Sequence, residues 1–109
     1  MTGLSRLDVV WADLGAPAGR RPVCILTRDA AIPVLNALVC APITRTIRGI
    51  ASEVRLDAST GLGAKCVIVC DTILTVPVAA FDPEPVSRLD PVAASALDRA
   101  LRYALDIRW

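Results

Sequence analysis

The chain has 109 residues, which is room for a single domain, and we place that domain at residues 1–109. Hydrophobic residues make up 54% of the chain and the mean hydropathy is +0.54, so there are more apolar side chains than one small core readily buries. We therefore expect a homodimer, in which a subunit interface covers the excess. The formal net charge is only +1, so bulk charge does not indicate a nucleic-acid partner, which would need a local basic face.

Neither a membrane span nor an export signal is predicted. The sequence contains no apolar run near the ~20 residues that a membrane-spanning helix needs. Residues 1–6 lack the charged-then-apolar order of a signal peptide. We therefore expect a cytoplasmic protein that does not contact a membrane.

Two strands are predicted near the start of the chain. Residues 7–14 indicate the first strand, and the small residues and proline of 15–19 end it in a tight turn. Residues 22–27 are nearly all apolar, as expected of a strand that is covered on both faces. Pro22 is expected to open this strand, because proline has no amide hydrogen for the ladder.

Four further stretches predict the rest of a sheet. Residues 35–44 form the third strand, in which Pro42 indicates an edge or a bulge that turns polar residues outward. The alternating pattern of 52–56 favours a half-exposed strand, and the apolar run 65–70 favours a central one. Residues 73–76 are expected to close the sheet.

A helix is predicted at the end of the chain, after a rigid connector at 81–85. Asp90 supplies an N-cap and Pro91 a first-turn proline. Asp98 and Arg102 lie four residues apart and are expected to pair weakly. The apolar face of the helix consists of Leu97, Leu101, Ala104 and Leu105. The fold class predicted from these elements is mainly β (α+β), a small curled sheet with one C-terminal helix.

The cysteines are expected to be reduced core residues. All four lie in stretches rich in Val, Ile and Leu, where a thiol packs like a small apolar side chain; they are Cys24, Cys40, Cys66 and Cys70. None belongs to a CxxC pair, and the chain has no histidine that could complete a zinc site. We therefore expect neither a metal nor another cofactor.

The absence of histidine also excludes acid–base catalysis by an imidazole. The remaining polar candidates lie at strand ends and turns, and they are Arg20, Arg21, Thr44, Arg45, Thr46, Arg48, Lys65, Asp71 and Thr72. Taken alone, Arg20 and Arg21 are better explained as the solvated start of a strand, and Asp71 as a turn former. Thr44 is equally explained as a turn cap, and surface charge is an equal explanation for Arg45, Arg48 and Lys65. For Trp11 and Trp109, packing is favoured over stacking on a nucleobase.

Four segments follow one another in an order typical of one family. Residues 8–14 are similar to its opening strand, 19–27 to its G-x-R-P-hydrophobic strand, 41–44 to its P-[IV]-T turn, and 67–76 to its D-Q-hydrophobic-x-[ST] segment. Together these segments resemble the MazF/PemK family of toxins. Residues 27–33 and 46–49 indicate the actinobacterial branch; these two are T-R-D-A-A-I-P and T-I-R-G.

The resemblance implies an SH3-like barrel of the MazF/PemK/CcdB type, and a homodimer that binds single-stranded RNA in a groove across both subunits. It also implies a metal-independent endoribonuclease of a toxin-antitoxin pair, held inactive by a MazE-like antitoxin. On this basis Arg21 and Thr44 are the catalytic candidates. Contacts to RNA are assigned to Arg20, Arg45, Thr46, Arg48, Lys65, Asp71 and Thr72.

The chain departs from the family pattern at two places. The first loop, residues 15–19, is short and apolar where the family usually has a longer polar or acidic loop. Thr72 stands where many members have glutamine. Both departures concern base contacts and RNA sequence preference, and neither touches Arg21 or Thr44.

The implied chemistry fits these two residues. Attack of a ribose 2′-oxygen on the adjacent phosphorus needs no metal if the charge of the phosphorane is neutralised and the attacking oxygen is held in line. Arg21 can donate two parallel hydrogen bonds to phosphate oxygens, and Thr44 can donate one more. A guanidinium rarely releases its proton, so the general base is expected to be a nearby carboxylate or water.

Two other functions remain open. A CcdB-like toxin of the same fold would bind DNA gyrase through its C-terminal helix, around residues 106–109, and would cleave nothing. A non-catalytic SH3-like adaptor is less well supported, because aromatic residues are only 4% of the chain and such grooves are lined with them.

Overall fold

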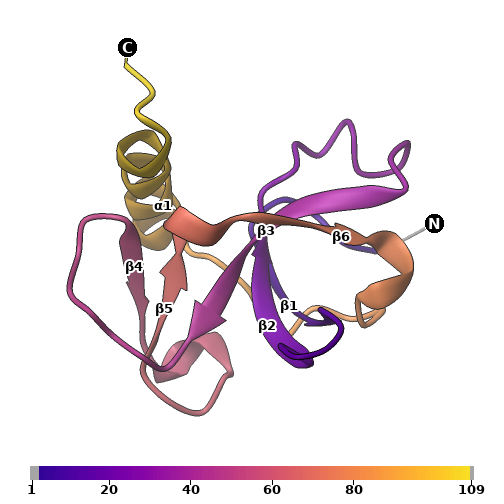
Figure 1. The fold of residues 1–109 in the computed structure, drawn as a ribbon, viewed down its shortest axis with the longest axis horizontal. Helices are drawn as coiled ribbons and strands as arrows, with labels where there is room; N and C mark the ends of the chain where they lie inside the picture. Colours follow the sequence, from indigo (N-terminus) through magenta and orange to yellow (C-terminus); the bar gives the residue numbers. More distant parts are fainter. Residues whose placement is uncertain (1–2, 109) are drawn as a thin grey trace.

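The computed structural model describes residues 3–108, and within them the chain forms a curled antiparallel sheet with one long helix at its side (Figure 1). The strands are β1 (Asp8–Asp13), β2 (Arg20–Ile25), β3 (Ala37–Thr44), β4 (Glu53–Leu56), β5 (Cys66–Val69), β6 (Leu74–Pro77) and β7 (Ser87–Arg88). The helices are α1 (Pro91–Leu105) and the short 3-10 turns η1 (Ala58–Thr60), η2 (Cys70–Thr72) and η3 (Val78–Ala80). This architecture confirms the predicted mainly β fold with a C-terminal helix.

Strand β3 joins the two halves of the sheet. The strand order is β4-β5-β3-β2-β1-β7, and β6 also pairs with β3. The first half of β3 pairs with β6, from Ala37↔Pro77 to Cys40↔Leu74, while its last two residues pair with β5. Figure 1 shows β3 passing from the β1–β2–β6 side of the molecule to the β4–β5 side. The prediction that β5 is a central strand is confirmed.

The barrel is closed by the chain that follows β6, and not by residues 73–76 as expected. Phe81 forms an isolated bridge with Ala12 of β1, and the Val86 amide donates to the Val9 carbonyl at 2.7 Å. Strand β7, which the sequence did not predict, then pairs with β1. A two-residue strand carries too little periodicity to be recognised in the sequence.

The sheet packs a core on each of its faces. Val9 and Cys24 point into a core that includes Leu97 of α1, while Val10 and Val23 point into a second core around Leu38 and Phe81 of the other face. This alternation confirms that the second strand is covered on both faces over residues 23–25, and it explains why these residues are apolar. The cysteines are buried, as predicted: Cys24, Cys40, Cys66 and Cys70.

Two strand boundaries differ from the prediction. Strand β2 begins at Arg20, so Pro22 lies inside the strand and pairs with Trp11. Proline is tolerated there because β3 pairs with β2 only from Val23 onward, so no ladder partner requires an amide hydrogen at position 22. Strand β3 begins at Ala37.

Helix α1 begins as predicted. The Asp90 side chain accepts a hydrogen bond from the Ala93 amide at 2.8 Å, and Pro91 occupies the first turn. Of the expected apolar face Leu97 is fully buried, whereas Leu105 is 49% exposed. The helix covers β4 and η2. In the described chain no helix is long and apolar enough to cross a membrane.

The predicted pairing of Asp98 with Arg102 is wrong. Asp98 lies 3.8 Å from the guanidinium of Arg6, which comes from the segment before β1. The tertiary fold therefore supplies a cation that replaces the local partner four residues away.

Candidate active site

A groove opens where β2 and β3 separate. Their register runs from Ile25↔Cys40 to Val23↔Pro42, and its continuation would place Arg21 opposite Thr44. Instead β3 turns to β5, through the pairs Ile43↔Ile68 and Thr44↔Val67. The ladder ends at two residues without an amide hydrogen, Pro22 and Pro42, and this gives a physical reason for the separation.

The groove has a volume of about 790 Å³. It is lined by Trp11, Leu14, Ala18, Arg20, Arg21, Pro22, Pro42, Ile43, Thr44, Arg45, Thr46, Leu62, Ala64 and Cys66. The fold thus brings both catalytic candidates together with Arg20, Arg45 and Thr46. The lining residues include three arginines and no carboxylate, which makes the groove a cationic, concave surface.

Arg21 and Thr44 have free donors in this groove. Arg21 is exposed, and within residues 3–108 no hydrogen bond or ion pair engages its guanidinium. Thr44 is half-buried at the end of β3, and its Oγ1 accepts a hydrogen bond from the Thr46 amide at 3.2 Å. Because the oxygen is the acceptor, the hydroxyl hydrogen remains available for a ligand in the groove.

Arg20 lies in the same groove but already has a partner. Its Nη1 and Nη2 donate to the two carboxylate oxygens of Asp82 at 2.7 and 2.9 Å, and its guanidinium carbon lies 5.6 Å from the Trp11 ring centroid. These hydrogen bonds raise the pKa of Arg20 and lower the pKa of Asp82. Trp11 is half-buried and lines the groove, whereas Trp109 lies outside the described residues.

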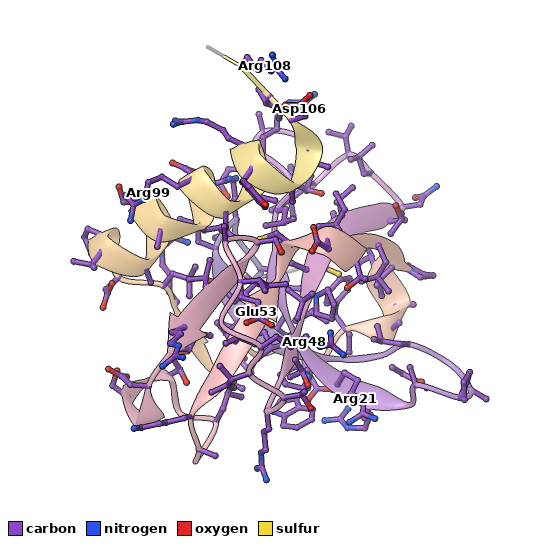
Figure 2. All side chains as sticks on the ribbon, turned by 60° about the vertical axis from the view of Figure 1, so that its left-hand side comes forward. Arg21, Arg48, Glu53, Arg99, Asp106 and Arg108 are labelled. Carbon is purple, nitrogen blue, oxygen red and sulfur yellow. The ribbon has the colours of Figure 1, made fainter. Side chains whose placement is uncertain are left out.

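The loop after β3 is organised by Glu53, which the sequence analysis did not identify. The Glu53 carboxylate accepts hydrogen bonds from the Arg48 amide at 3.1 Å and the Gly49 amide at 2.9 Å. Gly49 has a φ of +71°, a conformation that glycine adopts without strain. Figure 2 shows Arg48 beside Glu53, and in that view Arg21 lies below and to the right of both. Arg48 is exposed and does not line the groove.

The other candidates lie outside the groove. Asp71 accepts a 2.6 Å hydrogen bond from the buried hydroxyl of Ser52, so its carboxylate anchors η2 to the start of β4. Thr72 is exposed on the same turn, and Lys65 is exposed between two lining residues without lining the groove itself. Nothing in the sequence indicated that these three residues lie apart from the groove.

The four cysteines are buried, and burial raises their pKa values. Burial raises the pKa of Cys24 and of Cys40 to about 12, and it also raises the pKa of Cys66, the one cysteine that touches the groove. A thiol with a raised pKa carries little thiolate at neutral pH and is a poor nucleophile. Among residues 3–108, no group of three or more His, Cys, Asp or Glu side chains is placed to hold a metal ion.

These features define a class of small β-barrel proteins that hold an unpaired arginine and a threonine in a cationic groove. Residues 5–105 match the family described as PemK-like, MazF-like toxin of type II toxin-antitoxin system. The chain therefore belongs to this family, which confirms the resemblance seen in its strand motifs.

Individual relatives agree with this assignment. Endoribonuclease MazF3 of Mycobacterium tuberculosis is 50% identical over 58 residues, which cover 53% of this chain and 56% of that protein. The chain thus spans about half the length of that curated relative. The solved Mycobacterium tuberculosis toxin MazF-mt6 is 37% identical with a TM-score of 0.86, and the match covers 94% of this chain and 99% of that one.

A more distant structure shows the fold alone. It is an endoribonuclease in complex with its cognate antitoxin from a mycobacterial species, with 24% identity and a TM-score of 0.86. The match covers 98% of this chain and 99% of that chain. The CcdB alternative receives no support from these relatives.

Proposed function

We propose that this protein is the toxin of a type II toxin-antitoxin pair, a metal-independent endoribonuclease that cleaves single-stranded RNA at a short sequence motif and thereby inhibits translation and growth. The observation that carries the proposal is the groove at the β2–β3 separation, where the unpaired guanidinium of Arg21 and the hydroxyl of Thr44 line one concave surface. Family membership and the named activity of MazF3 support it.

In the proposed reaction the ribose 2′-oxygen attacks the adjacent phosphorus while the bond to the 5′-oxygen breaks. The products are a 2′,3′-cyclic phosphate and a 5′-hydroxyl. Arg21 stabilises the phosphorane with two parallel hydrogen bonds, and Thr44 donates a third. Because the described lining contains no carboxylate, water accepts the 2′-hydroxyl proton and solvent returns a proton to the 5′-oxygen.

The protein's partners follow from the same proposal. We expect a cytoplasmic homodimer, whose interface covers exposed apolar residues such as Val34, Val92 and Tyr103. We also expect an antitoxin with an acidic segment whose carboxylates lie beside Arg20, Arg21 and Arg48, as the acidic counterpart of RNA phosphates. The family's description as the toxin of a type II toxin-antitoxin system supports an antitoxin partner.

The deciding experiment is RNA cleavage by the purified protein with and without excess EDTA. Cleavage is expected to persist with the chelator and to leave the ends named above, as mapped by 5′-end analysis. An RNA with 2′-deoxyribose at the scissile position should bind and stay intact. Loss of cleavage with EDTA contradicts the mechanism, and inhibition of DNA gyrase supercoiling without RNA cleavage would favour the CcdB-like function.

A further inference from the structure

The ion pair between Arg20 and Asp82 is placed at the edge of the proposed RNA groove. Arg20 lines the groove, whereas Asp82 is outside the lining and reaches Arg20 from the connector after η3. The pair is bidentate, with N–O distances of 2.7 and 2.9 Å. A phosphate presents two oxygens to an arginine in the same geometry, so a carboxylate and a phosphate compete for this face of the guanidinium.

The carboxylate of Asp82 is held in place by its backbone. The Asp82 amide donates to the Trp11 carbonyl at 2.9 Å, and the preceding residue, Phe81, is buried and bridged to Ala12. On the other side, the Trp11 ring lies below the Arg20 guanidinium. The β1–β2 hairpin and a connector distant in sequence thus hold Arg20 in a neutralised state, while its neighbour Arg21 stays unpaired.

We propose that Asp82 is an internal competitor for RNA at Arg20, and that it limits the affinity of the groove for RNA by occupying the guanidinium in the position of a phosphate. The inference rests on the proposed nuclease function and adds an affinity-determining residue to it. Arg21 and Thr44 perform the chemistry, whereas Asp82 acts only through Arg20. Its removal therefore changes the binding of RNA and leaves the chemical step intact.

The test measures binding of a random-sequence, single-stranded 2′-O-methyl oligoribonucleotide pool, which lacks the attacking hydroxyl and cannot be cleaved. Asp82→Asn frees Arg20 for one more phosphate contact. We expect the affinity at low salt to rise about fivefold and the slope of log K against log salt to steepen by about 0.7, the value for one phosphate of a single strand. With cleavable RNA, KM should fall and kcat should stay unchanged.

A matched control is Glu84→Gln. Glu84 is exposed on the same connector, and this change removes one negative charge two residues away. It reports the general electrostatic effect, so any larger gain in Asp82→Asn belongs to the contact with Arg20. When Asp82→Asn is added to Arg20→Ala, the affinity for RNA should not rise above that of Arg20→Ala alone.

Three results would overturn the inference: an affinity of Asp82→Asn equal to that of Glu84→Gln, a loss of affinity, or a gain that survives Arg20→Ala. A purely structural pair predicts the loss, whether through unfolding or a displaced connector. A wild-type protein that cleaves RNA while Asp82→Asn gains nothing refutes this inference alone. A wild-type protein that neither binds the pool nor cleaves RNA refutes the proposed function together with it.

Discussion

Arg21 and Arg99 are both exposed arginines, but only Arg21 lies in the candidate groove. Arg99 on helix α1 is exposed and, within the described chain, has no ion-pair partner, just as Arg21 has none. Figure 2 shows the two residues on opposite sides of the molecule. Arg21 lies in a concave groove with a hydroxyl and two further arginines, whereas Arg99 projects from a convex helix. Strand separation therefore gives Arg21 the concavity and the additional donors that Arg99 lacks.

The largest expected effect is that of Arg21→Ala, with Arg99→Ala as its control. Arg21→Ala should lower kcat for RNA cleavage by about a hundredfold or more, the scale for loss of a transition-state charge partner. Arg21→Lys should recover little, because an ammonium cannot donate the two parallel hydrogen bonds. Steady-state cleavage of a defined oligonucleotide measures both. Equal activity of Arg21→Ala and Arg99→Ala would contradict the assigned site.

Removal of the Thr44 hydroxyl should have a smaller effect. Thr44→Val keeps the shape of the side chain and loses one neutral donor, so kcat should fall about tenfold, while Thr44→Ser should retain most activity. Thr75→Val on β6, which is exposed and outside the groove, is the matched control. The prediction fails if the two valine variants cleave RNA at the same rate.

Arg45 is expected to contribute binding without chemistry. Arg45 lines the groove next to Thr44. Arg45→Ala should raise KM a few-fold, and the slope of log K for RNA binding against log salt should become shallower by about 0.7. Arg99→Ala is again the control, since it removes the same charge from the helix. A fall in kcat at unchanged KM would instead place Arg45 in the chemical step.

The smallest effect on catalysis is expected at the helix end. Asp90→Ala removes the N-cap hydrogen bond to the Ala93 amide and should lower the free energy of unfolding by about 1 kcal/mol. The groove lies away from this cap, so kcat of the folded protein should not change. Chemical denaturation and a cleavage assay on the same preparation test both parts, and a large loss of kcat would show that the helix supports the site.

Local features were predicted well from the sequence. The cap at Asp90 and Pro91 depends on residues adjacent in the chain, and the apolar run of β2 follows from burial on both faces of one strand. The start of β2 was misplaced because the effect of Pro22 depends on where β3 pairs. Likewise, Asp98 was assigned to Arg102 because Arg6 approaches only in the folded chain.

The amino-acid sequence by itself therefore determined the strand periodicity, the buried thiols, the capped helix and the Arg-Pro and Pro-Ile-Thr motifs that indicate the family. Only the tertiary structure decided which polar residues share a groove. It brought Thr44 and Arg45 together with Arg21, placed Asp71 outside the groove with a bond to Ser52, and paired Arg20 with Asp82. The physical reason is that these contacts join residues distant in the chain. They depend on where strands separate and bridge, which local side-chain preferences do not encode.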